Sequence, residues 1–205
     1  PWAMGQAGCT PESLFELRSG VEFIGGDEIV EGDIGDLNND GWPDIVLSNN
    51  NTQDLSVILA DGNEGFLPSV RLALDAGQDL VLGENLRIAD VNNDGALDIV
   101  ALAGSVLNPR LFLGNGDGTF APYTEIDVIL PPTTFSLAAG LEVADLDLDG
   151  NADVVVVNLL GDTVVAWGLG NGLFEAPLRV IPSFNGDLRA VTVADFDADG
   201  LPDIA

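Results

Sequence analysis

Four short segments of the chain repeat one pattern of acidic and amide side chains. They are Asp36–Asp44, Asp90–Asp98, Asp145–Asp153 and Asp195–Asp203, here called loops 1 to 4. Each loop has an oxygen-bearing side chain at positions 1, 3, 5 and 9 and a glycine at position 6. Ligands that are all oxygen suit a hard cation and disfavour zinc or copper, and Ca²⁺ takes more protein oxygens than Mg²⁺ does. The spacing therefore predicts up to four Ca²⁺ sites, one in each acidic loop.

The ligands of each predicted site are alternate side chains and one backbone carbonyl. A glycine at position 6 permits the positive φ of a tight turn, and the carbonyl of residue 7 then points inward. Position 9 begins the next predicted strand, which holds its carboxylate in place. The predicted ligands are Asp36, Asn38, Asp40, Trp42 and Asp44 in loop 1, Asp90, Asn92, Asp94, Ala96 and Asp98 in loop 2, Asp145, Asp147, Asp149, Asn151 and Asp153 in loop 3, and Asp195, Asp197, Asp199, Leu201 and Asp203 in loop 4.

Electrostatic repulsion supports a bound cation. Two carboxylates about 4 Å apart repel each other by roughly 4 kcal/mol at an effective dielectric constant of about 20, so a cluster of three or four requires a cation or protonation. Loops 3 and 4 carry aspartate at position 3, where loops 1 and 2 carry Asn38 and Asn92. We expect loops 3 and 4 to bind Ca²⁺ more tightly, because more ligand charge raises affinity.

Two other interpretations fit part of the loop pattern. An EF-hand or a dockerin shares the opening pattern, but an EF-hand needs a glutamate at position 12. Leu47, Ala101 and Val156 stand there instead, and the flanking segments have strand character. The second alternative, an aspartate-rich turn that holds no metal, stays open.

The charge balance excludes several classes of partner and of enzyme. The chain has 34 acidic and 6 basic residues, a formal net charge of −28, and neither lysine nor histidine. Such a surface repels nucleic acid and anionic membranes, and no apolar run reaches the length of a membrane span. Without histidine or lysine there is no Ser-His-Asp triad, Cys-His pair or Schiff base. We expect a protein that is not an enzyme, binds no nucleic acid and does not insert into a membrane.

The acidic loops recur at intervals of 54, 55 and 50 residues, which indicates a repeat protein. Each loop is followed by two strand-like runs, a glycine-rich turn that ends in phenylalanine (Phe66, Phe120 and Phe174), and a last extended run. Four short strands per unit of about 50 residues are typical of propeller blades. The predicted repeats are 26–75, 83–131, 138–183 and the start of a fourth at 189–205, within an all-β segment 13–205. Residues 1–12 are predicted to be an N-terminal linker or a cloning remnant.

The acidic loop between two strands, followed in phase by a Gly-Asn-Gly-Asp-Gly-Thr-Phe type turn, resembles the FG-GAP/VCBS repeat family. The resemblance implies the β-propeller of integrin α subunits and bacterial surface proteins, with calcium held by residues 1, 3, 5, 7 and 9 of each loop. Propellers of this family close with about seven blades, more than this chain carries. Either the chain is a fragment, or Leu14–Ile24 supplies strands to the last blade, which would give a small ring or a half-ring that pairs with a second copy.

The expected function is a calcium-binding scaffold for adhesion or for binding a protein or glycan ligand, integrin-like in type. The alternative is the propeller part of a polysaccharide-degrading enzyme, or its carbohydrate-binding accessory. Weak calcium sites fill where calcium is roughly millimolar, so we expect an extracellular, cell-surface or periplasmic location. Cys9 is the single cysteine and forms no disulfide within the chain, and whether it carries a lipid stays open.

Overall fold

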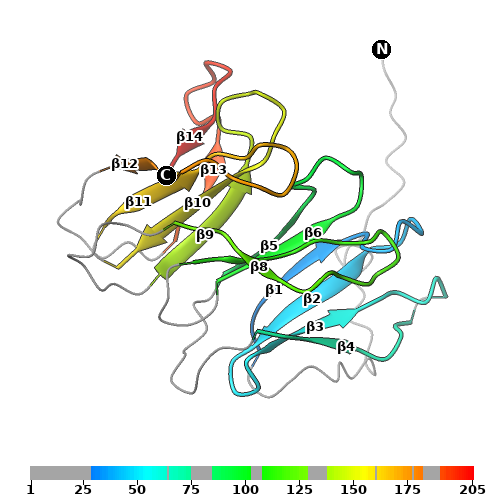
Figure 1. Cartoon of the computed structure of the whole chain (residues 1–205). Coiled ribbons are helices and arrows are strands. Elements are labelled where there is room, and N and C mark those ends of the chain that lie inside the picture. Colours follow the sequence, from blue (N-terminus) through cyan, green and yellow to red (C-terminus); the bar gives the residue numbers. More distant parts are fainter. Residues whose placement is uncertain are drawn as a thin grey trace, which may run out of the picture.

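The computed structural model describes residues 29–63, 65–74, 85–102, 108–128, 138–159, 161–176, 178–181 and 190–205, with only the backbone described at 138 and 178–181. Every regular element among these residues is a β-strand (Figure 1). The described chain has no helix of the length and hydropathy that crossing a membrane requires. The predicted linker 1–12 and the segment Leu14–Ile24 lie outside the described residues.

The strands form three antiparallel sheets of four and one pair. Blade 1 contains β1 (Ile29–Gly35), β2 (Asp44–Asn49), β3 (Asp54–Ile58) and β4 (Val70–Ala73); blade 2 contains β5 (Leu86–Ala89), β6 (Asp98–Ala101), β7 (Arg110–Phe112) and β8 (Thr124–Glu125); blade 3 contains β9 (Ala138–Ala144), β10 (Asp153–Asn158), β11 (Thr163–Ala166) and β12 (Leu178–Ile181); the pair is β13 (Val193–Ala194) and β14 (Asp203–Ile204). Within each sheet every strand pairs with the next one in the sequence. The structure therefore confirms the predicted three four-stranded units and the start of a fourth.

The blades stack face to face, and the core lies between them. Strand β1 contacts β5, and β5 contacts β9, so the first strands of successive blades are neighbours (Figure 1). Along β6, Ile99 packs in the cluster shared with blade 1, whereas Val100 packs in the cluster shared with blade 3. Along β10, Val154 faces blade 2 and Val155 faces the β13–β14 pair. The continuous apolar runs of the middle strands follow from this arrangement, since both faces of an inner blade are buried.

An ion-pair relay joins the first strands of the three blades. The guanidinium of Arg87 in β5 donates to Glu31 of β1 at 3.0 Å and to Glu142 of β9 at 3.2 Å. Burial lowers the pKa of Arg87, but hydrogen bonds to Glu142 and Glu31 outweigh that effect and raise it. Burial raises the pKa of Glu31, although its hydrogen bonds with Arg87 and with the amide of Leu86 act against the rise. One arginine thus stands between two carboxylates that would otherwise repel each other across the stack.

Candidate metal centres

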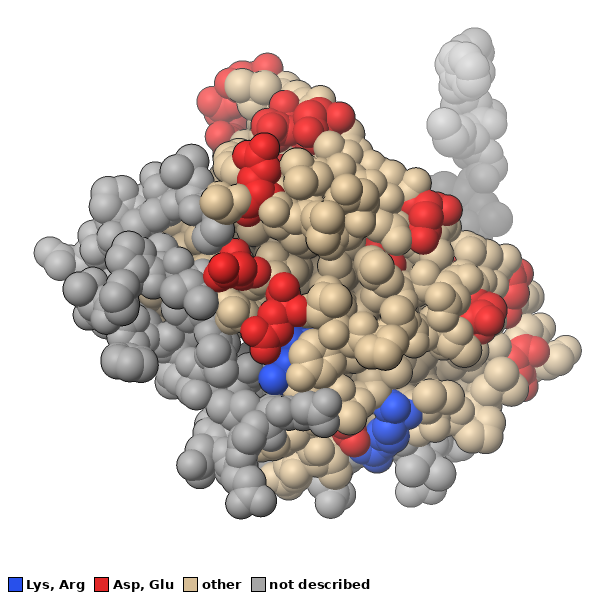
Figure 2. All heavy atoms as spheres, in the orientation of Figure 1, with Lys and Arg blue, Asp and Glu red and all other residues tan. Residues whose placement is uncertain are grey.

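Each acidic loop connects the first and second strands of its blade, or the two strands of the β13–β14 pair. The loops project from the ends of these strands (Figure 1). On the face shown in Figure 2, acidic side chains gather along the top and right margins, and basic ones reach the surface at few places.

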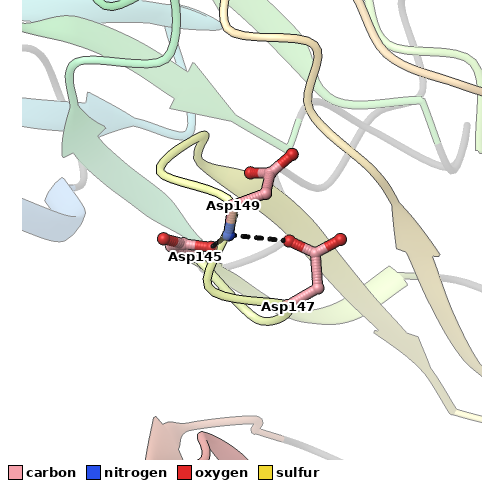
Figure 3. A group of neighbouring side chains, drawn as sticks. All are labelled: Asp145, Asp147 and Asp149. Carbon is pink, nitrogen blue, oxygen red and sulfur yellow. Dashed lines mark hydrogen bonds between the residues drawn. The ribbon is translucent and has the colours of Figure 1, made fainter.

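The aspartate at position 1 organises the loop through backbone amides. In loop 3 the Asp145 carboxylate accepts hydrogen bonds from the amides of Asp149 at 3.1 Å and Gly150 at 2.9 Å. Asp147 accepts from the same Asp149 amide at 3.1 Å (Figure 3), and Asp149 accepts from the amide of Asn151 at 2.8 Å. The equivalent bonds recur in loops 1, 2 and 4. The same sequence pattern therefore produces the same turn four times.

Two positions in each loop have left-handed backbone conformation. The predicted glycine at position 6 has it, with φ of +89° at Gly150 in loop 3. Position 4 has it as well, with φ of +57° at Asn39, +58° at Asn93, +62° at Leu148 and +62° at Ala198. Sequence reasoning missed position 4. The signal was there in loops 1 and 2, since asparagine is one of the few side chains that tolerate this conformation.

Loops 3 and 4 bring three carboxylates together. One oxygen each from Asp145, Asp147 and Asp149 lie within 4.8 Å of one another, as do oxygens of Asp195, Asp197 and Asp203 in loop 4 (Figure 3 shows loop 3). The donors are all carboxylate oxygens, so these residues fit the predicted hard cation. The two groups differ in one member, because Asp149 belongs to the first and Asp199 is absent from the second, where the position 9 carboxylate takes part instead.

Loops 1 and 2 do not bring three carboxylates together, although both loops are fully described. The asparagine at position 3 donates to the carboxylate at position 5, from Asn38 to Asp40 at 2.9 Å and from Asn92 to Asp94 at 2.8 Å. An amide donor thus lies where loops 3 and 4 have a second carboxylate. The predicted inward carbonyls of Trp42, Ala96, Asn151 and Leu201 stay predictions.

The aspartate at position 9 has a structural role that the sequence pattern did not reveal. Asp98 is fully buried, and its two oxygens accept from the amides of Val91 at 2.9 Å and Gly114 at 2.8 Å. Asp44 and Asp153 are equally buried and make the equivalent two bonds. Asp203 is partly buried and accepts from the amide of Phe196 at 3.0 Å. The carboxylate therefore ties the start of its loop to the glycine-rich turn of the same blade.

Two of these carboxylates, Asp98 and Asp153, have raised pKa values. Burial raises the pKa of Asp98, and the nearby charges of Asp94 and Asp90 raise it further, although the two amide hydrogen bonds lower it. Burial raises the pKa of Asp153 in the same way, with Asp147 and Asp149 adding to the rise. Because each carboxylate oxygen has two lone-pair sites, an oxygen that accepts from an amide can still ligate a cation. A bound cation would offset the repulsion between these negative charges.

Loops 1 and 2 also contact the next blade. The side-chain amide of Asn93 in loop 2 donates to the side-chain oxygen of Asn151 in loop 3 at 2.8 Å. The amide of Gly118, in the glycine-rich turn of blade 2, donates to the carbonyl of Leu37 in loop 1 at 3.1 Å. The loops are therefore part of the contact between blades as well as candidate metal sites.

Solved structures with the same fold include three proteins of different kinds. A lectin of Agrocybe aegerita, described as specifically recognising non-reducing terminal N-acetylglucosamine, is 24% identical with a TM-score of 0.61 over 83% of this chain and 44% of its own. BBS1N, solved in complex with ARL6DN and soaked with lead, is 14% identical with a TM-score of 0.56 over 83% of this chain and 49% of its own. The Tc holotoxin pore of Photorhabdus luminescens is 21% identical with a TM-score of 0.51 over 84% of this chain and 8% of its own.

The chain spans less than half the length of each of these proteins, and at these identities they show the fold alone. No curated protein is similar enough in sequence to match the chain. The FG-GAP-like repeat, in contrast, matches three overlapping stretches, residues 36–101, 90–156 and 145–205. Each stretch runs from one acidic loop through the next one and its following strand, so it spans the junction between two successive sheets. The chain is therefore a member of the FG-GAP-like repeat family, and its described blades form part of a β-propeller.

Proposed function

We propose that this chain is a calcium-stabilised segment of an extracellular propeller that binds a ligand. The observation that carries the calcium proposal is the convergence of Asp145, Asp147 and Asp149 within 4.8 Å on a turn that recurs in all four loops. Three carboxylates this close repel one another strongly at the surface of a chain with a net charge of −28. A divalent cation is the simplest way to keep them together at neutral pH.

The residues at positions 1, 3, 5 and 9 would hold Ca²⁺, and the ion would supply positive charge among them. Backbone amide hydrogen bonds to the carboxylates at positions 1 and 3 fix the turn and orient these side chains. Because Asn93 of loop 2 donates to Asn151 of loop 3, order in one loop favours order in its neighbour. We infer that calcium stabilises the stacking of blades as well as the individual loops.

A binding role fits this scaffold better than a catalytic one. The chain has no histidine or lysine to serve as a base or nucleophile, and its clustered aspartates are assigned to the metal. The lectin with the same fold is described as recognising a terminal sugar, which supports a glycan as the class of ligand. A protein ligand is the alternative. An extracellular or periplasmic location would provide the calcium that exposed, incompletely charged loops such as loop 1 need.

Calorimetric titration of the chelator-treated protein with Ca²⁺ tests the proposal. We expect saturable binding, with tighter sites in loops 3 and 4, and a stabilisation of about 2.7 kcal/mol per site at a hundred times its dissociation constant. The matched variants are Asp149→Asn in loop 3 and Asp94→Asn in loop 2, which remove one position 5 carboxylate each. Absence of calcium heat together with an identical thermal melt in calcium and in chelator would refute the metal function.

A further inference from the structure

Two grooves lie at equivalent places between blades. Each is formed by the outer strand of one blade and by the segment around the phenylalanine of the next blade's glycine-rich turn. The groove between blades 1 and 2 has a volume of about 550 Å³, and the groove between blades 2 and 3 about 440 Å³. Phe120 lines the first and Phe174 lines the second, and these residues occupy the same place in the repeat. Both volumes suit a small ligand.

The groove between blades 1 and 2 has an aromatic wall. Phe112, Phe120 and Tyr123 line it from blade 2, and Arg71 and Leu72 line it from β4. The rings of Phe112 and Tyr123 lie 5.6 Å apart between centroids at a tilt of 58°, which fixes the tyrosine ring at the groove. A half-buried aromatic ring of this kind offers an apolar face with a polar hydroxyl at its edge.

A positive charge lies behind this wall. The guanidinium carbon of Arg110 stands 4.8 Å from the centroid of the Tyr123 ring. Arg110 is 6% exposed, makes no ion pair with the described carboxylates, and its Nη1 is buried without a hydrogen-bond partner. Among the described residues, the ring of Tyr123 is the partner found for this charge, and Glu125 lies opposite Arg110 in β8. Burial leaves the charge weakly screened by solvent.

The rim of the same groove carries a second arginine with accessible donors. Arg71 pairs with Asp54 at 2.8 Å through Nη1, and 38% of its side chain remains exposed. A guanidinium has five N–H donors, so a single-sided pair leaves several for a ligand. None of the described residues that line this groove is acidic.

The groove between blades 2 and 3 has the opposite charge. Glu125, Asp127 and Glu175 line it, and none of its described lining residues is basic. Two grooves of the same construction therefore differ in the sign of the charge that they present. A ligand with an anionic group is attracted to the first and repelled by the second, over the distance of about 10 Å within which charges act at 0.1 M salt.

We propose that the groove between blades 1 and 2 binds a saccharide that carries a carboxylate, a uronic acid unit, with its ring on Tyr123 and its carboxylate at Arg71. The sugar ring supplies C–H groups for the aromatic face, and the carboxylate meets the exposed donors of Arg71 within the field of Arg110. This inference rests on the proposed ligand-binding function and specifies the class of ligand.

The test uses the fact that Tyr123 is the only tyrosine of the chain. Protein labelled with 3-fluorotyrosine gives one ¹⁹F resonance, which is followed during titration of the calcium-saturated protein. The probes are the methyl glycosides of glucuronic acid and of glucose, which have the same ring and differ in the carboxylate. We expect a saturable shift with the glucuronide, at an affinity about tenfold above that of the glucoside, since one charge-assisted bond separates them.

Two variants locate the site. Arg71→Gln should lower glucuronide affinity about tenfold and leave the weak glucoside affinity unchanged, while Glu175→Gln in the other groove should change neither. Arg71 belongs to an ion pair with Asp54 in which its own side chain is 38% exposed, so its replacement costs little stability. Equal affinity for the two glycosides, or a glucuronide affinity that Arg71→Gln leaves intact, would overturn the proposal.

The same experiment separates this inference from the proposed function. If calorimetry shows heat of calcium binding but the glucuronide causes no ¹⁹F shift, the uronate groove is rejected and the metal function is retained. A sugar that binds by calorimetry while the Tyr123 resonance stays still would keep ligand binding and reject this groove as its place.

Discussion

Replacing Asp98 by asparagine tests whether the position 9 aspartate is a structural residue as well as a metal ligand. Its carboxylate is completely buried and accepts one amide with each oxygen, from Val91 at 2.9 Å and from Gly114 at 2.8 Å. Asparagine keeps the shape but has one oxygen. One of the two amides therefore loses its acceptor and faces an N–H₂ group.

The expected loss is set by two opposing effects. A buried N–H without a partner costs about 1–3 kcal/mol. Neutralising the carboxylate relieves its burial and the repulsion from Asp94 and Asp90, the causes that raise its pKa. The two effects together predict that Asp98→Asn lowers the free energy of unfolding of the calcium-free protein by about 1–2 kcal/mol.

Two matched variants make the result specific. Asp203→Asn affects a partly buried carboxylate for which one amide bond is found, from Phe196 at 3.0 Å, and should cost less than half as much. Asp94→Asn changes an exposed carboxylate at position 5, which should cost nothing without calcium and should remove most of the calcium stabilisation of loop 2. The ordering of the three variants without calcium is therefore fixed by their burial and amide partners.

The assay is urea unfolding followed by tryptophan fluorescence, in chelator and again in saturating calcium. Trp167 packs at the core between blade 3 and the β13–β14 pair and reports on its unfolding. Circular dichroism checks that each variant keeps its sheet content. If Asp98→Asn is as stable as the unchanged protein in chelator, or if Asp94→Asn is the most damaging of the three there, the amide bonds do not have the role assigned to them.

Three further predictions concern the loops and the relay between blades. Leu148→Asn should raise the free energy of unfolding by about 0.5–1 kcal/mol, because leucine is strained at φ +62° and is 55% exposed there. At the equivalent position of loop 2, Asn93→Leu should be destabilising in thermal melts, because it also removes the hydrogen bond to Asn151. Arg87→Met should lower the free energy of unfolding, measured with urea, by about 1–3 kcal/mol, because it leaves Glu31 and Glu142 unpaired. This loss is smaller than for a fully buried ion pair, since 24% and 19% of the two glutamate side chains are exposed. An unchanged free energy of unfolding would mean that these ion pairs contribute nothing to stability. Burial raises the pKa of Glu31 in the folded protein above 4.5. Its contribution to stability is therefore full below pH 4.5 and is lost as the pH rises through the raised pKa. Glu31→Gln should flatten the pH dependence of the free energy of unfolding in that window, and a steeper dependence would contradict the sign.

Much of the blade could be predicted because its signals are local. The two strand-like runs expected after each complete acidic loop are present, as β2 and β3 after loop 1 and as β10 and β11 after loop 3. The glycine at position 6 was expected to have positive φ, and Gly41, Gly95, Gly150 and Gly200 have it. Each of these features depends on a residue and its immediate neighbours, so the sequence pattern carries the information.

The candidate site could be predicted in part. The convergence expected in loops 3 and 4 is present, but their carboxylate groups differ, and the carboxylates of loops 1 and 2 do not group in the same way. Loops 1 and 2 have an asparagine in place of the position 3 aspartate, and its amide donates to the carboxylate at position 5. The residue types predicted which ligand oxygens each loop has, whereas the structure shows which of these oxygens lie close together.

By itself, the sequence determined the repeat, the strand pattern and the four acidic turns, since these follow from side chains that interact within about ten residues. Only the tertiary structure decided that Asp44 receives amides from Leu37 and from the distant Ala60, that Arg87 joins strands of three blades, and that one groove between blades is lined by arginine and the next by acids. The physical reason is that, apart from the Leu37 bond, the hydrogen bonds named here join residues 16 to 56 positions apart along the chain, so they depend on how the strands and blades pack. They exist because stacking buries the blade faces and brings such residues together.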